Sequence, residues 1–393
     1  SVEDRDLLFK MHEFLVNSQD PELSKKYDLR PAVGIAAIQL GIPKRMCAIH
    51  VLDYDSKGNV VKANDYALVN PKIVSYTQKN SFLRDGEGCL SVNKEVQGYV
   101  PRHAKVTVEG YDLLTDQEVK NNDINVVPIP VIVGDKEYSE GVNITSTQLF
   151  EMERQGAAFP KTSQPSMGQM IELCNKLHGE GYEAIIAITL SSGISGFYQN
   201  MVNMAHNNPE YNLYPYDSKM TVRLQGYLVL AAARMIKNGM EPEAILKKLD
   251  EIRKTIDEFF VVDDLKNLSR GGRLSNAGAF IGTMLQIKPL LTFNDEGKIV
   301  AFDKIRSLKR AVSKVEKLTL EKTANLPYKD KLRLFVFHSN DLKQAEQIKQ
   351  FVNENFPDKP VDVAEFSPVI AIHLGEKSIA IAWMVDIDKL ELK

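Results

Sequence analysis

The spacing of apolar residues divides the chain near residues 119–125. Before this point, residues 7–17 repeat their apolar positions with helical spacing, and the polar residues 18–30 predict a loop. Strand-like runs separated by turn residues follow, at positions 45–52, 67–69, 72–77, 99–100 and 104–108. This part of the chain therefore predicts a mixed α+β segment, mostly antiparallel, that begins with one helix.

After residue 125 the pattern alternates between long amphipathic helices and short, continuously apolar strands. The predicted helices are 147–154, 167–180, 194–206, 223–238, 242–259 and 308–322, and the predicted strands are 126–133, 184–190, 331–338, 367–373 and 378–385. Alternation of this kind is typical of an α/β fold with parallel strands. A second change of pattern near residues 261–266 completes a division into domains 1–120, 121–262 and 263–393.

The composition excludes several classes of function. Apolar residues make up 44% and charged residues 26%, as in an ordinary folded protein, and the net charge is -3. No segment has the excess of Lys and Arg that nucleic-acid binding usually requires. The longest apolar runs are too short to cross a bilayer, the first residues do not resemble a signal peptide, and three cysteines are too few for a disulfide framework. We therefore expect a cytoplasmic protein with no membrane span and no nucleic-acid partner.

Two motifs in the first segment carry recognisable chemistry. Residues 32–39 read AVGIAAIQ, and residues 87–91 read EGCLS. In this order the two motifs resemble those of peptide deformylase, over about residues 1–120. The resemblance implies that Cys89 is a ligand of a catalytic Fe or Zn ion, and that Gln39 polarises the formyl carbonyl of the substrate. Metal-dependent removal of N-formyl groups from nascent proteins is therefore an alternative function for the chain.

The third deformylase motif, two histidines one helical turn apart with a glutamate between them, is absent from the sequence. The seven histidines are His12, His50, His103, His178, His206, His338 and His373, and no two of them are four residues apart. A catalytic zinc ion needs three protein ligands and an open position for water. With one ligand left, the segment predicts no hydrolytic centre, and Cys89 is interpreted more simply as a small buried thiol. His50 and His103 are interpreted as structural.

Hydroxyl-bearing residues gather at two predicted junctions of the second segment. Residues 162–166 (TSQPS) precede the helix predicted at 167–180, and residues 191–196 (SSGISG) follow the strand predicted at 184–190. Small hydroxyl residues and the amides at the start of a helix favour an anion, and open α/β sheets bind ligands at such strand ends. Either motif alone is also compatible with a helix cap or a tight turn.

Three further motifs follow in order, at residues 267–275 (NLSRGGRLS), 288–291 (KPLL) and 366–375 (FSPVIAIHLG). Together with the two hydroxyl motifs they resemble the DegV family, over about residues 121–393. That family consists of two-domain bacterial α/β proteins that bind one long-chain fatty acid in a cleft between the domains, and some of them carry the acyl group for a fatty acid kinase. The resemblance implies the same function here, with a long-chain fatty acid and a kinase subunit as partners, and with no cofactor required for lipid binding.

The resemblance to DegV proteins also assigns site residues. Thr162 and Ser192, with their neighbours Ser163 and Ser195, would bind the carboxylate of the fatty acid. The polar mouth of the cleft would be lined by Arg270, Arg273 and His373. The chain would act as a lipid-binding subunit and not as the kinase, because the sequence contains no P-loop motif.

Both resembling segments are truncated where they meet, near residues 120–122. The DegV family opens with a strand ending in Asp-Ser-Thr ahead of the predicted strand 126–133, and those residues are missing here. Loss of that strand predicts an unpaired sheet edge. Because the joint has no long linker, the sequence is compatible with a natural fusion, an artificial chimera or a misassembled scaffold.

Overall fold

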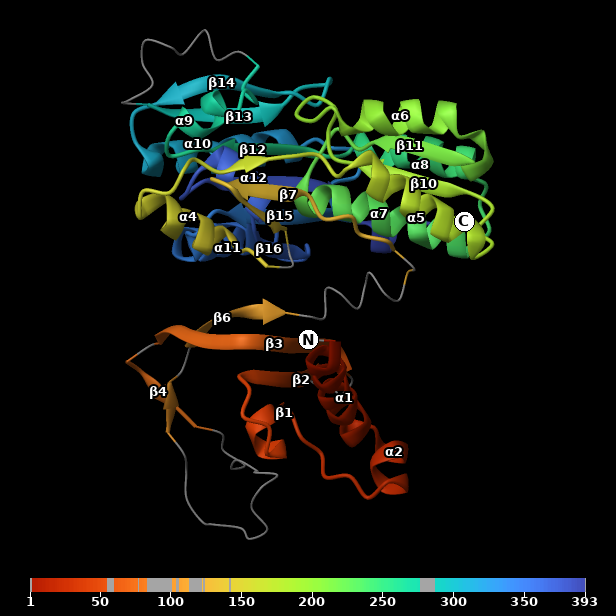
Figure 1. Ribbon diagram of the computed structural model, residues 1–393. Coiled ribbons are helices and arrows are strands. Elements are labelled where there is room, and N and C mark those ends of the chain that lie inside the picture. The colour runs from red at the N-terminus through yellow and green to blue at the C-terminus, as the bar shows by residue number, and fades with distance from the viewer. Residues whose placement is uncertain are drawn as a thin grey trace. The chain divides into compact units, whose positions relative to one another are not determined.

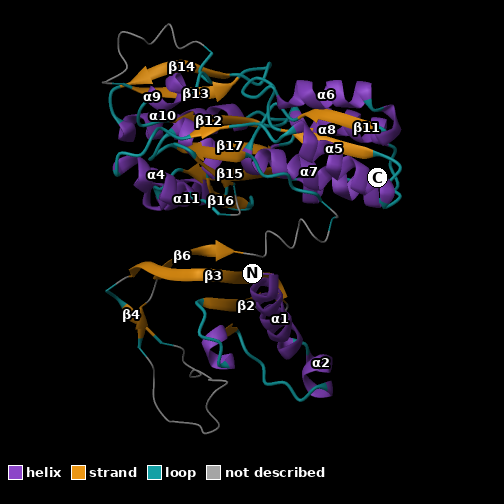
Figure 2. Cartoon of the chain, viewed as in Figure 1, coloured by secondary structure: helices purple, strands orange, loops and turns teal. Residues whose placement is uncertain are grey.

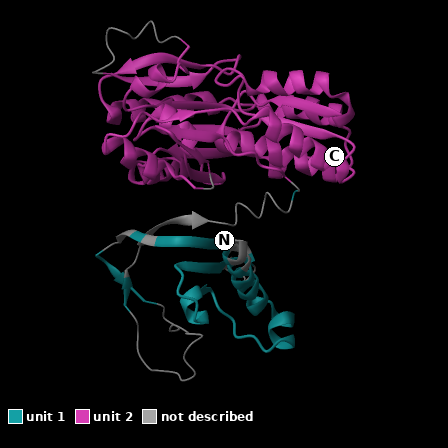
Figure 3. Cartoon of the chain, in the orientation of Figure 1, with its two compact units in different colours: residues 1–123 teal, residues 124–393 magenta. Residues whose placement is uncertain are grey.

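The chain forms two compact units, residues 1–123 and residues 124–393 (Figure 3). The computed structural model describes residues 2–54, 60–76, 78–82, 101–103, 106–112, 122, 124–140, 143–275 and 287–392. Within these ranges, no helix combines the length and the apolar character that crossing a bilayer requires. The finer division of the second unit at residue 262 remains a prediction.

The first unit is a four-stranded antiparallel sheet packed against helix α1 (Val2–Gln19). The strand order is β1 (Gly34–Ala36), β2 (Met46–Tyr54), β3 (Val60–Tyr76) and β6 (Val106–Asp112), and β4 (Asn80–Ser81) pairs separately with β5 (Arg102–His103). Leu8, Met11 and Leu15 recur at helical spacing on α1 and are buried against Ala48 and Ala67 of the sheet. The mixed α+β segment with a leading helix is therefore present as predicted.

Residues 18–30, predicted as a loop, contain helix α2 (Pro21–Lys26). The Asp20 side chain accepts hydrogen bonds from the backbone amides of Glu22 and Leu23, and Pro21 occupies the first helical position. Both features favour the start of a helix. None of the α2 residues is buried, so no apolar periodicity marks this helix in the sequence.

The second unit is built around a six-stranded mixed sheet (Figures 1 and 2). Its strand order is β14 (Ile299–Ile305), β13 (Lys288–Phe293), β12 (Asp257–Val261), β17 (Ile379–Val385), β15 (Leu332–His338) and β16 (Val361–Glu365). Strands β15 and β16 run parallel, and the other four pairings are antiparallel. The α/β class is confirmed, but the expectation of parallel strands is wrong for most of this sheet.

Beside this sheet lies a parallel pair, β10 (Ile185–Thr189) and β11 (Leu213–Asp217), with helices around it (Figure 1). The helices are α5 (Met167–Gly179), α6 (Phe197–Asn207), α7 (Val222–Lys237) and α8 (Pro242–Arg253). A three-stranded antiparallel sheet, in the order β8 (Lys136–Ser139), β7 (Pro130–Val133) and β9 (Lys161–Thr162), completes the strands of the unit's described part. Among the described residues β10 and β11 pair only with each other, so both edges of this pair lack a strand partner.

The two faces of the six-stranded sheet carry separate cores. Along β17, Ala380, Ala382 and Met384 face one core, and Ile379, Ile381 and Trp383 face the other, because successive side chains of a strand point to opposite faces. Helices α10 (Leu308–Thr323) and α11 (Leu342–Asn355) cover the face with the large side chains. Helices α4 (Ser146–Arg154), α7, α8 and α12 (Pro368–Leu374) contribute to the core on the alanine face.

Two predicted elements in the second unit have the wrong type or length. Residues 367–373, predicted as a strand, form helix α12, in which five residues are buried. A short, continuously apolar run does not distinguish a buried strand from a buried helix, and Pro368 at the first helical position was the missed signal. The helix predicted at 242–259 ends at Arg253, and its last three residues, 257–259, belong to β12.

The loop after β10 packs tightly against the turn between β13 and β14. Ser191 Oγ donates a hydrogen bond of 2.6 Å to the carbonyl oxygen of Gly297. A Cβ atom on Gly193 would overlap that same carbonyl group, so the position admits only glycine without movement of one segment. The hairpin therefore holds the SSGISG loop in place.

We predict that Gly193→Ala lowers the free energy of unfolding by about 1–3 kcal/mol, because the added methyl group must push the loop and the hairpin apart. Urea denaturation followed by the fluorescence of Trp383, the single tryptophan of the sequence, measures this in the second unit. Gly179→Ala is the control, since a Cβ atom there has open space. Equal stability of the two variants would contradict the packing described here.

Candidate functional site

The second unit contains a cavity of 370 Å³ on the alanine face of the six-stranded sheet. This volume lies at the lower end of the range of about 300–1,000 Å³ that small-molecule sites occupy. Ala380 and Ala382 form part of its floor, and the surrounding apolar side chains include Leu224, Phe260, Phe293, Phe337, Val369 and Ile370. Most of the wall is therefore suited to an apolar ligand.

Six of the seven predicted lipid-site residues line this cavity, namely Thr162, Ser163, Ser192, Ser195, Arg273 and His373. They come from β9, the loop after β10, the loop after α9 (Lys266–Arg270) and helix α12. The seventh, Arg270, is not part of the lining: it is exposed, and its guanidinium lies 5.4 Å from the ring centroid of Phe159. The fold thus brings residues that are up to 211 positions apart to one polar end of the cavity.

His373 makes a hydrogen bond to Thr162, with 2.9 Å between Nε2 and Oγ1. It was interpreted from the sequence as a residue at a strand end, and it lies instead in helix α12. Burial, helped by the nearby positive charge of Arg273, lowers the pKa of His373 to about 4. The imidazole is therefore neutral at pH 7.

The other ring nitrogen of His373, Nδ1, is buried without a partner among the described residues. A buried N–H without an acceptor is rarer in proteins than an acceptor without a donor. The arrangement therefore favours the tautomer in which Nε2–H donates to Thr162 Oγ1. In that tautomer the hydroxyl hydrogen of Thr162 is available to a ligand in the cavity.

The hydroxyl group of Ser192, predicted to bind the carboxylate, already has an acceptor within the protein. Ser192 Oγ donates to Asp217 Oδ2 at 2.6 Å, and the Ser192 backbone amide donates to Asp217 Oδ1 at 3.0 Å. Asp217 ends strand β11, and the sequence analysis did not identify it. Binding of a carboxylate by the Ser192 hydroxyl would require this bond to break.

Arg273 has two roles: it bonds the loop after β10, and it contributes a positive charge to the cavity wall. Its guanidinium donates to the carbonyl oxygen of Ile194 at 3.4 Å and to the carbonyl oxygen of Gly271. A Cβ atom on Gly271 would collide with Nδ1 of His373, so the glycine permits the close approach of this loop to α12. The RGGR motif therefore places one positive charge beside His373.

Glu258 also lines the cavity, and the sequence analysis missed it. It stands at the start of strand β12, in a stretch that was interpreted as the end of a helix. A period-two reading of residues 257–261 would have put Glu258 and Phe260 on the same strand face. Because β12 has only five residues, its alternation was too short to be distinguished from the end of the preceding helix.

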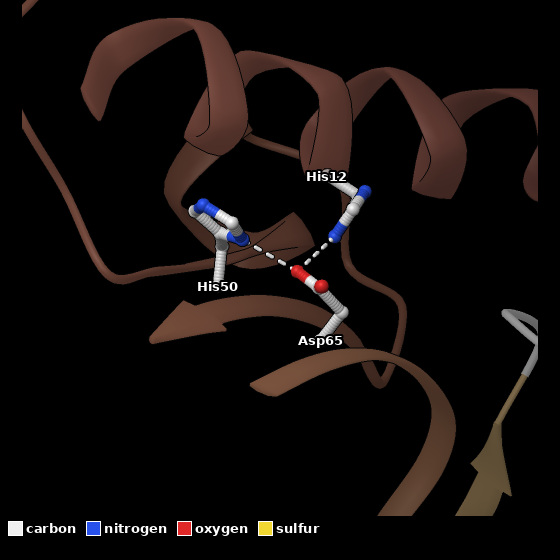
Figure 4. A group of neighbouring side chains, drawn as sticks. All are labelled: His12, His50 and Asp65. Carbon is white, nitrogen blue, oxygen red and sulfur yellow. Dashed lines mark hydrogen bonds and ion pairs between the residues drawn. The ribbon is translucent and has the colours of Figure 1, made fainter. Parts of the chain in front are cut away.

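In the first unit, three side chains converge on one point: His12 of α1, His50 of β2 and Asp65 of β3 (Figure 4). His12 Nε2 and His50 Nδ1 both donate to Asp65 Oδ1, at 2.8 and 2.5 Å. Burial acts to raise the pKa of Asp65, but the hydrogen bonds from His50 and His12 outweigh it and hold the pKa below its usual value. His50 is thus part of a partly buried polar network with His12 and Asp65.

The three residues of this network are of types that bind zinc or iron, and their ligand atoms lie within 4.8 Å of one another. They do not match the deformylase arrangement, in which Cys89 joins two histidines of one later helix. Cys89 lies outside the described residues. Gln39 is exposed, and its Oε1 accepts a hydrogen bond from the backbone amide of Ala36. The residues present do not fit the deformylase metal.

We predict that Asp65→Asn weakens the anchoring of α1, because an amide oxygen replaces a charged acceptor shared by two imidazole groups. The expected loss is about 1–3 kcal/mol, the range for hydrogen bonds to charged groups. Faster hydrogen exchange of the α1 amides in the full-length chain would report it. Asp28→Asn, at an exposed position, is the control, and unchanged exchange in Asp65→Asn would rule out a structural role for the network.

We also predict that His373 makes the second unit sensitive to acid. Its pKa is about 4 in the folded chain and about 6.5 when unfolded, so the unfolded state binds a proton first. Stability is complete above pH 6.5 and falls as the pH is lowered toward 4, by about 3 kcal/mol from this residue.

The measurement is urea denaturation at several pH values, followed by Trp383 fluorescence. In His373→Gln the fall between pH 6.5 and 4 should be smaller, although the similarly buried His338 keeps its own contribution. Exposed His178→Gln should behave like the wild type. An identical pH dependence in His373→Gln and the wild type would contradict the lowered pKa.

Two family models match the chain. The model described as an uncharacterised protein of the DegV family matches residues 104–386, and the polypeptide deformylase model matches residues 1–124. The chain is 36% identical over 280 residues to a DegV domain-containing protein of Listeria innocua, covering 71% of this chain and 98% of that protein. It is 37% identical to Protein DegV of Bacillus subtilis over 266 residues, covering 67% of this chain and 92% of that protein.

Solved structures agree with this assignment. A fatty acid binding DegV family protein from Streptococcus agalactiae has a TM-score of 0.63 and 35% identity, with 67% of this chain and 92% of that chain covered. DegV of Bacillus subtilis, described as a fatty acid binding protein, has a TM-score of 0.62 and 36% identity, with 69% and 95% covered. By its family model and by relatives covered over nearly their whole length, the chain belongs to the DegV family, preceded by a segment that matches polypeptide deformylase.

Proposed function

We propose that the second unit binds a long-chain fatty acid in its cavity, with the carboxylate at the Thr162–His373 end. The observation that carries this proposal is the cavity itself, which is apolar along the sheet and polar at one end. The similar proteins from Streptococcus agalactiae, Bacillus subtilis and Thermus thermophilus are described as fatty acid binding. Those descriptions support the same ligand class for this chain.

The acyl chain provides most of the affinity in this proposal. A sixteen-carbon acid buries about fifteen methylene groups at roughly 0.8 kcal/mol each, or about 12 kcal/mol before the costs of binding. A hydrogen bond from a hydroxyl group to the carboxylate contributes about 1.5–3 kcal/mol. The cavity wall therefore sets how tightly the ligand binds, and the polar end sets which head group is accepted.

Thr162 is the donor that we assign to the carboxylate. Its hydroxyl group accepts from His373 Nε2 and so directs its own hydrogen toward the ligand. Arg273 contributes a positive charge at the same end, and a bound anion there would raise the pKa of His373 from its low value. The Ser192 hydroxyl, held by Asp217, contributes less.

We further propose that the bound carboxylate is presented to a fatty acid kinase in the cytoplasm. Ser163 and Ser192 are exposed at the polar end of the cavity, so a partner protein could reach the head group there. The chain would then be the lipid-carrying partner, and the phosphate would be transferred on the second protein. Formation of acyl phosphate by the chain together with a kinase subunit, and not by either alone, is the test.

We predict that Thr162→Val weakens palmitate binding at least tenfold, because the carboxylate loses its donor and His373 Nε2–H loses its acceptor. Isothermal titration calorimetry on delipidated full-length protein measures the affinity. Thr147→Val is the matched control, since this half-buried threonine lies outside the cavity.

Ser192→Ala should reduce the affinity less than Thr162→Val does, because the Ser192 hydroxyl already donates to Asp217. If Thr162→Val binds palmitate as tightly as the wild type, the carboxylate is not held at this end. If the wild type neither carries nor takes up a fatty acid, the proposed function is wrong.

A further inference from the structure

The cavity contains a carboxyl group that the binding of a simple fatty acid does not use. Glu258 lines the cavity and is 4% exposed. Its Oε1 accepts hydrogen bonds from the backbone amide of Phe293 at 2.6 Å and from Thr292 Oγ1 at 3.2 Å. Its Oε2 is buried and has no partner among the described residues. One oxygen of Glu258 is therefore fixed to β13, and the other makes no hydrogen bond to the described protein.

The strand register separates Glu258 from the polar end of the cavity. Phe260 of β12 pairs with Ala380, and Glu258 pairs with Ala382. Ala380 lies at the start of β17, close to the loop that follows His373, so Glu258 lies two residues farther along the sheet. Two residues of a strand span about 6.6 Å. Glu258 thus faces the part of the cavity where an acyl chain would run.

Burial raises the pKa of Glu258 to about 8, and the neighbouring Asp257 also raises it. Among the described residues, Arg273 is the only Lys or Arg that lines the cavity, and its guanidinium bonds to backbone carbonyl oxygens. With no cation paired to it in the described structure, Glu258 is mainly protonated at pH 7. Because Oε1 accepts two hydrogen bonds, the proton resides on Oε2, which is then a buried O–H donor without an acceptor.

We propose that this cavity selects a fatty acid whose chain carries an oxygen, as a hydroxyl or an oxo group, and that Glu258 Oε2–H donates a hydrogen bond to that oxygen. The inference rests on the proposed fatty acid function and adds the class of acyl chain. A saturated hydrocarbon chain would leave the Glu258 donor buried and unpaired, which is costly. A site with a buried polar group therefore discriminates against ligands that cannot satisfy it.

The test compares stearate with 10-hydroxystearate, 12-hydroxystearate and 10-oxostearate on delipidated full-length protein at pH 7. We expect at least one oxygenated acid to bind about tenfold more tightly than stearate. In Glu258→Leu that advantage should disappear and stearate should bind at least as tightly as before. Glu258→Gln, whose amide still donates, should keep part of the preference.

Glu316 provides the matched control, because this half-buried glutamate of α10 is not part of the cavity lining. Glu316→Leu should leave every affinity within twofold of the wild type. Infrared difference spectra of the wild type add a readout that requires no destabilising variant. The C=O band of protonated Glu258, identified by its loss in Glu258→Gln, should shift with an oxygenated acid and not with stearate.

Equal binding of stearate and all oxygenated acids by the wild type would overturn the inference and leave fatty acid binding intact. So would an oxygenated preference that persists in Glu258→Leu, or a C=O band that no ligand shifts. Failure of the wild type to bind any of the four acids would remove the proposed function and this inference together.

Discussion

The alternation of side chains along β17 is the constraint on which the second unit depends. This strand lies in the middle of the six-stranded sheet, and both of its faces are buried. Ile379, Ile381 and Trp383 fill the face under α10 and α11. Ala380 and Ala382 lie on the other face, where their small side chains leave the space that the cavity occupies. A space of this size is unusual in a close-packed interior, where few voids are larger than a water molecule.

The protonation states of the polar groups in the cavity follow from the cost of burying a charge. His373 is neutral because a buried charge beside Arg273 would be costly, and Glu258 is mainly protonated because no cation faces it. Each group bonds the protein through one atom and has a second, buried atom without a partner among the described residues. His373 is bonded to Thr162 at the polar end, and Glu258 lies farther along the sheet. The cavity therefore holds donors at two separate depths.

The joint between the two matched families also has a structural consequence. The DegV model begins at residue 104 and the deformylase model ends at residue 124, so both include the residues of β6. In the structure β6 pairs with β3, as part of the first unit. The parallel pair β10–β11 gains no strand from this stretch, and among the described residues both of its edges remain open. The strand that lies within both matches is therefore part of the sheet of the first unit.

The sequence by itself determined the class of the fold, the family and most of the residues at the polar end of the cavity. It did so because motifs such as TSQPS, SSGISG and RGGR combine turn residues with hydroxyl or basic groups in a fixed order. Only the tertiary structure decided that residues 367–373 are a helix, that Ser192 is held by Asp217, and that Arg270 lies outside the cavity. Local patterns report periodicity and composition, whereas hydrogen-bond partners and burial arise from residues brought together across hundreds of positions. Glu258 shows this most clearly. Its position on the cavity wall follows from the strand register, and its Oε2 has no hydrogen-bond partner among the described residues.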